Sequence, residues 1–221
     1  MSQLSRSVKS LGERSIRPGS YSAVVTIARG TGRQALIEAT AEVLRTGGDV
    51  QVSQIATDLG ISHTLVYRHF PDGGREQLVA EAYAHLFRGF ASADVEEFFR
   101  IISLGSIDTA ELVALGERIL GPRRKDVRAA RLLALSASLA NDQVAEYVER
   151  ARRELVDDFI ERLRAHDAGW SDEGATALAV LTLGIPLGIA AVGGRDLGRG
   201  ERTALARMWA DAILAALAAR Q

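Results

Sequence analysis

Apolar residues recur every three or four positions along most of the chain, which is the spacing of one face of an α-helix. The first such stripe predicts a helix over residues 33–45, and another over residues 75–91 follows a Gly-Gly break. Later stretches begin at residues that cap helices, namely Asp94, Asp108, Asn141 and Ser171. The remaining expected helices cover residues 95–104, 109–120, 122–139, 141–166, 172–192 and 200–220. The pattern predicts an all-α protein.

Between the first two long helices, residues 52–70 predict two short helices joined by a tight turn. Ser53 is placed to cap the first, and Gly60 suits the left-handed residue that often ends a helix. Ile61 fills the corner, and Ser62 is placed to cap the second helix.

The second short helix has two different faces. Its apolar positions are Leu65, Val66 and Phe70. Its outer face lacks an acid and carries His63, Thr64, Tyr67, Arg68 and His69. These side chains can reach phosphates or base edges, so the segment is typical of a helix-turn-helix whose second helix enters a DNA major groove. The same spacing also fits a purely structural helix hairpin.

Residues 33–79 resemble the DNA-binding domain of the TetR family of transcriptional regulators. The matching positions are Ser53, Ile55-Ala56, Gly60-Ile61-Ser62 and Leu65-Val66-Tyr67-Arg68-His69-Phe70. The resemblance implies a three-helix DNA-binding domain and a larger helical domain for ligand binding and dimerisation. It implies a homodimeric, ligand-responsive repressor on a palindromic operator of double-stranded DNA. Arg75 stands near the family's phosphate-contacting Lys, although Asp72 would repel phosphate.

On this basis we expect three parts: a flexible basic arm over residues 1–31, a DNA-binding domain over 32–74 and a helical domain over 75–221. The expected DNA-contacting residues are Ser53, Ser62, His63, Thr64, Leu65, Tyr67, Arg68, His69 and Arg75. Within that set, Tyr67 is expected to contact the DNA backbone and so position the protein, whereas His63 and Thr64 are expected to contact base edges.

Composition adds little to this picture. The net charge of −1 does not by itself indicate a nucleic-acid partner, and the absence of cysteine excludes disulfides. No apolar run of about 20 residues lacks polar interruption, and no secretory signal is present, so we expect a cytoplasmic protein without a membrane partner.

The last two expected helices have broad apolar faces, which predict a four-helix interface with a second copy of the chain. The expected interface residues are Leu181, Ile185, Gly188, Leu205, Trp209 and Ile213. The middle helices are expected to enclose a small-molecule effector, with the aromatic candidates Phe87, Phe90, Phe98, Phe99, Tyr147 and Trp170.

Other clusters point to no further chemistry. A basic run over residues 123–131 fits a solvated face better than an anion site. Glu81 and His85 lack further ligands for a metal, and no catalytic serine arrangement or cofactor motif is found, so no enzyme activity or cofactor is expected. Two alternatives remain: a helical small-molecule-binding protein or enzyme, and a helical adaptor for another protein.

Overall fold

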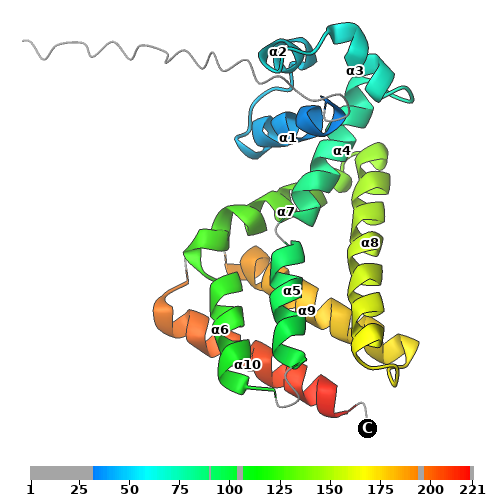
Figure 1. Cartoon of the computed structure of the whole chain (residues 1–221). Helices are drawn as coiled ribbons and strands as arrows, with labels where there is room; N and C mark the ends of the chain where they lie inside the picture. Colours follow the sequence, from blue (N-terminus) through cyan, green and yellow to red (C-terminus); the bar gives the residue numbers. More distant parts are fainter. Residues whose placement is uncertain (1–31, 90, 104–106, 194–196, 220–221) are drawn as a thin grey trace, which may run out of the picture.

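The computed structural model describes residues 32–89, 91–103, 107–193 and 197–219, and these ranges contain helices and no strand (Figure 1). The expected basic arm and Phe90 lie outside the described residues. The helices are α1 (Gly32–Arg45), α2 (Val52–Asp58), α3 (His63–His69), α4 (Arg75–Arg88), α5 (Ala91–Ile102), α6 (Thr109–Ile119), the 3-10 turn η1 (Pro122–Arg124), α7 (Lys125–Ser138), α8 (Asp142–His166), α9 (Asp172–Gly193) and α10 (Arg199–Ala218). The predicted all-α class is confirmed.

Helices α1, α2 and α3 form a small group at one end of the molecule (Figure 1). Leu36 of α1, Val66 of α3 and Phe70 after α3 are completely buried in its core. Leu78 of α4 belongs to the same core, so the small group is closed by the helix that follows it. Burial of each such side chain stabilises the folded state by roughly 1.5–3 kcal/mol.

Helix α4 also belongs to the larger body, where it packs chiefly against α8. Ala80, Ala84 and Phe87 of α4 share a second core with Val148 and Ala151 of α8. Small side chains on α4 allow the two helix axes to approach closely. One helix therefore contributes to the packing of both ends of the molecule.

The far end of the body has a third core around Phe98 and Phe159, whose rings lie 5.4 Å apart. There α10 packs chiefly on α6. A Cβ added to Gly116 of α6 would lie 3.0 Å from Cβ of Ala206, so the two helices approach each other closely at this point.

Several helix starts differ from those expected. Asp108, Asn141 and Ser171 accept bonds from backbone N–H groups as predicted. Ser53 and Asp94 do not cap: α2 begins at Val52 after Gln51, and Asp94 lies inside the first turn of α5. Asp94 instead pairs with Arg124 at 2.8 Å.

By length and composition, α9 could cross a membrane: residues Asp172–Ile189 have a mean hydropathy of 1.3, and only 22% of them are buried. The sequence pattern predicted no membrane-spanning segment, so the apolar length of α9 was not expected. Pro186 lies inside the helix and lacks the N–H that would bond the carbonyl of Thr182.

Candidate nucleic-acid interface

The turn between α2 and α3 has the predicted geometry. Gly60 adopts a φ of +67°, and the next N–H, on Ile61, donates to the carbonyl of Ala56 at 2.8 Å. Ile61 is buried beneath the corner. Ser62 occupies the cap position of α3, but its side chain makes no capping hydrogen bond. The turn therefore depends on backbone bonds and Ile61.

Helix α3 separates its two faces sharply. Val66 and the following Phe70 are completely buried, which fixes the helix on the small core, while Leu65 is half-buried against it. The exposed side chains on or beside the helix are Ser62, His63, Thr64, Tyr67 and Arg68. None is acidic, and Arg68 has no ion pair or hydrogen bond within the described residues. An uncommitted guanidinium beside hydroxyl and imidazole groups suits contact with phosphates and base edges.

Tyr67 is the most prominent side chain of this face, with 52% of its surface exposed. Its ring meets that of His63 edge-on at 5.2 Å and lies against Gly74. Gly74 has a φ of +53°, and any Cβ there would come within 2.9 Å of the tyrosine ring. The Gly73-Gly74 pair predicted only a helix break. The positioning role of Gly74 was not predicted, although a glycine directly before a helix could have suggested it.

His69 and Arg75 are placed differently from the rest of the expected set. His69 is half-buried, and its Nε2 atom lies 3.4 Å from a Cβ position on Gly32. The Nε atom of Arg75 donates to the carbonyl of Val50 at 3.3 Å, and its guanidinium lies 3.9 Å from Asp49. Both side chains are therefore partly committed within the small group, whereas Ser53 is exposed on α2.

Arg33 links the small group to the body through α4, a contact that the sequence did not predict. Its NH2 atom donates to Glu81 of α4 at 2.6 Å, and its guanidinium lies 5.2 Å from the centre of the Phe70 ring. Glu81 is buried and also accepts from Gln77 at 3.1 Å. Glu81 thus serves an ion pair, and no group of metal-binding side chains occurs in the part of the chain that the structure describes.

The predicted dimer residues divide into two groups. Trp209 and Ile213 are 2% and 0% exposed, because their side of α10 faces the protomer's own core, so their side chains are not presented to a second copy in this structure. Gly188 is exposed, and Leu181, Ile185 and Leu205 are half-buried. Among the described residues of α9 and α10, the large apolar side chains with the greatest exposure are instead Val180 and Met208, 53% and 68% exposed.

The aromatic candidates for an effector pocket do not meet in one place. Phe98, Phe99 and Trp170 belong to the far core, where Phe98 and Phe99 contact Phe159. Phe87 and Tyr147 belong to the core between α4 and α8. Of the described candidates, only Phe98 lines the cavity that lies among α5, α6, α7, α9 and α10.

The interior cavity, about 40 Å³, lies among α5, α6, α7, α9 and α10. Its wall is mostly apolar but includes Asp94, Arg131, Thr182 and Trp209. Within the described residues, the Thr182 hydroxyl and the Trp209 indole N–H are buried without a hydrogen-bond partner. Burial raises the pKa of Asp94 and lowers that of Arg131. Unpaired buried donors are costly, so the cavity is suited to a small group that accepts hydrogen bonds.

Comparisons with known proteins support the fold. No family model matches the chain, and no curated protein is significantly similar to it in sequence. A solved structure from Pseudomonas aeruginosa PAO1, described as a "putative transcriptional regulator", is similar in fold, with a TM-score of 0.52 and 21% sequence identity. The similarity covers 86% of this chain and 93% of that one, so it includes both the small group and the body. At this identity it shows a shared fold.

Proposed function

We propose that this protein is a DNA-binding transcriptional regulator of the TetR type, acting in the cytoplasm as a homodimeric, ligand-responsive repressor. The observation that carries the proposal is the outer face of α3, where an acid-free set of donors is exposed while Val66 and Phe70 hold the helix in place. The sequence resemblance and the similar fold of a "putative transcriptional regulator" support the same assignment.

In this proposal α3 lies in the major groove. His63, Thr64 and Arg68 contact base edges, whereas Tyr67 and the half-buried His69 contact the backbone. Ser53, Ser62 and Leu65 lie at the margins of the same surface. Arg75 contributes to phosphate binding only if it releases Val50 and Asp49, so we assign it a smaller share.

Two copies are needed to read a palindrome, because paired recognition helices must be separated by about 34 Å, one turn of the duplex. The apolar exterior of α9, which includes the exposed Val180, and the exposed Met208 of α10 support a two-fold interface. Covering this surface with a second copy also explains an apolar helix without assigning it to a membrane.

The interior cavity supports the proposal that the protein responds to a small-molecule effector. Its unpaired donors on Thr182 and Trp209 would bind an acceptor atom of the effector. At about 40 Å³ it holds only a few atoms, so a larger effector has to displace neighbouring side chains. Such displacement would bias the arrangement of the helices around it.

Selection of bound fragments from random DNA tests the proposal. A palindromic product is expected, and Thr64→Ala should change base preference while Tyr67→Ala weakens binding to all fragments. Gln34→Ala, on the exposed surface of α1, is the matched control and should leave both unchanged. Recovery of no fragments above background would instead favour a helical protein whose hairpin is only structural.

A further inference from the structure

The wall of the interior cavity carries two buried hydrogen-bond donors, Thr182 of α9 and Trp209 of α10. The Thr182 hydroxyl and the Trp209 indole N–H make no hydrogen bond within the described residues, although the two residues are only 6% and 2% exposed. A buried donor that is left without an acceptor destabilises the fold. Because both residues line the same cavity, a single bound group could satisfy both donors.

The rest of the cavity wall is mostly apolar and limits the size of a ligand. Its apolar lining residues are Val95, Phe98, Leu115, Ile119, Leu183 and Pro186. The volume of about 40 Å³ has room for about three or four water-sized groups. A molecule that enters without moving the wall is therefore short, and its hydrocarbon part contacts this lining.

The two charged residues of the cavity wall are already engaged elsewhere. Asp94 pairs with Arg124 at 2.8 Å. Arg131 donates to the carbonyls of Phe87 and Arg88, at 2.8 and 3.1 Å. An ionised ligand would therefore be buried without a free counterion, which is strongly unfavourable. The cavity thus favours a neutral ligand.

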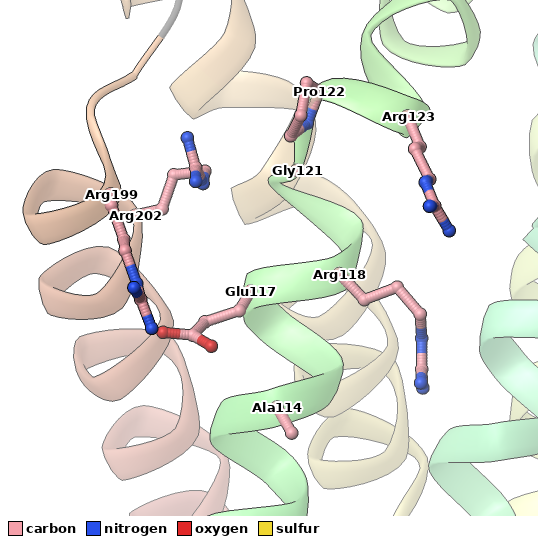
Figure 2. A pocket seen from close by; sticks show the side chains of 8 residues that line it. All are labelled: Ala114, Glu117, Arg118, Gly121, Pro122, Arg123, Arg199 and Arg202. Atoms are coloured by element: carbon pink, nitrogen blue, oxygen red, sulfur yellow. The ribbon is translucent and has the colours of Figure 1, made fainter.

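A larger pocket, of about 350 Å³, lies where the end of α6 meets the start of α10, and arginines line it (Figure 2). The guanidinium groups of Arg118 and Arg123 lie on one side of α6 and η1 (Figure 2). Those of Arg199 and Arg202 lie on the opposite side. Arg118 is also paired with Glu97 at 3.3 Å. These groups do not converge on one ligand, so the interior cavity has the better-defined set of polar contacts.

We propose that the interior cavity binds the carbonyl group of a small, neutral, apolar molecule, or of the end of a larger one. A carbonyl oxygen has two lone pairs and no proton, so it can accept from both Thr182 and Trp209 without adding a donor of its own. The attached carbons contact the apolar lining. Calling this molecule the effector rests on the proposed function, whereas its binding can be measured without DNA.

Three probes of nearly the same shape test this site: acetone, 2-methylpropene, in which a CH₂ group replaces the oxygen, and acetate, which carries a charge. Each is titrated into the full chain without DNA, and NMR follows the indole N–H signals of the two tryptophans, Trp170 and Trp209. Acetone should shift the Trp209 signal downfield and saturably, while the Trp170 signal stays in place. 2-Methylpropene should bind at least about threefold more weakly, because it accepts no hydrogen bond. Acetate should show no saturable binding.

Thr182→Val removes one donor with little change in shape, and the affinity for acetone should fall at least about threefold. The matched control is Thr40→Val in α1. Thr40 is also completely buried with a hydroxyl that has no partner in the described residues, but it does not line the cavity. Thr40→Val should leave the affinity within about twofold, and thermal melts verify that both variants fold.

Three results would overturn the proposal. The first is a Trp209 signal that does not move with acetone, as expected if an enclosed water alone satisfies the donors. The second is equal affinity for acetone and 2-methylpropene, and the third is an equal effect of Thr182→Val and Thr40→Val. Failure to select a DNA fragment would refute the proposed function but would leave acetone binding intact, so the two proposals fail separately.

Discussion

The ring of Tyr67 lies so close to Gly74 that a Cβ on the glycine would come within 2.9 Å of the ring carbon Cε1. Gly74 directly precedes α4, and Tyr67 stands on the exposed face of α3. The start of α4 therefore sets the direction of a proposed DNA-contacting side chain, and no larger residue can replace the glycine without moving that ring.

Substituting Gly74 with alanine should displace Tyr67. We expect a loss of about 2–3 kcal/mol in the free energy of unfolding, from the unfavourable φ and the steric contact, together with weaker DNA binding. Gly47→Ala is the control, because Gly47 has a φ of +73° with no atom within 4 Å of its Cβ position. It should cost about 1 kcal/mol and spare DNA affinity. Denaturant melts and gel shifts measure both quantities, and equal effects of the two substitutions would contradict the steric role.

The ion pair between Arg33 and Glu81 should stabilise the junction of the small group and the body. Glu81→Gln keeps the shape of the side chain but removes the charge that accepts from Arg33 at 2.6 Å. We expect a loss of about 1–2 kcal/mol, since the acceptor is buried although the arginine is partly exposed. A double-mutant cycle with Arg33→Gln measures the pairwise term, and additive effects would argue against coupling.

Charge introduced on the exterior of α9 or α10 should separate the proposed dimer. Val180→Glu or Met208→Glu would bury an unpaired carboxylate in the interface, and the dissociation constant should rise at least about a hundredfold. Leu139, 91% exposed after α7, provides the control substitution Leu139→Glu. Sedimentation velocity should show monomers for the first two variants and a dimer for the third. A wild-type chain that is monomeric would refute the interface itself.

Asp94 should make the folded protein less stable as the pH rises through the acidic range, which is opposite to the usual effect of a carboxyl group. Burial raises the pKa of this carboxyl above its ordinary value of 3.8, in spite of Arg124 nearby. The folded state then holds the proton to higher pH than the unfolded chain, so the free energy of unfolding falls as pH rises from about 3.8 through the raised pKa. Asp94→Asn removes this decline, so its stability relative to wild type should improve across that window.

Urea unfolding at a series of pH values measures the effect of Asp94. Asp157→Asn is the control, because Asp157 is an exposed acid with no ion pair in the described part of the molecule. The decline in stability expected for the wild type should persist in this variant, because Asp94 is unchanged in it. Parallel curves for Asp94→Asn and wild type would show that burial of Asp94 has no energetic consequence.

Local features were the most predictable from sequence. Gly60 takes the expected left-handed conformation, and Val66 and Phe70 are buried as their spacing predicted. Those features depend on a few neighbouring residues, so a short motif is enough to determine them. The cap expected at Ser53 failed because its helix begins one residue earlier, a shift that periodicity cannot detect.

Features that depend on distant contacts were not predictable in the same way. Helix α10 has apolar residues on more than one side, and periodicity alone could not show that Trp209 and Ile213 would face the core while Met208 remains outside. The basic run over residues 123–131 was expected to be a solvated face. Arg124 instead pairs with Asp94, Arg128 and Arg131 donate to backbone carbonyls, and Arg123 lines a pocket with Arg199. Only the fold brings those partners together.

The presence of Leu78 in the core of the small group has a practical consequence for anyone building chimeras. A fragment cut at residue 74 would lose that leucine and open a hole beside Leu36 and Val66. Transplanting α1, α2 and α3 onto another protein therefore requires a splice beyond the first turns of α4, and grafts made at residue 74 would yield unfolded hybrids.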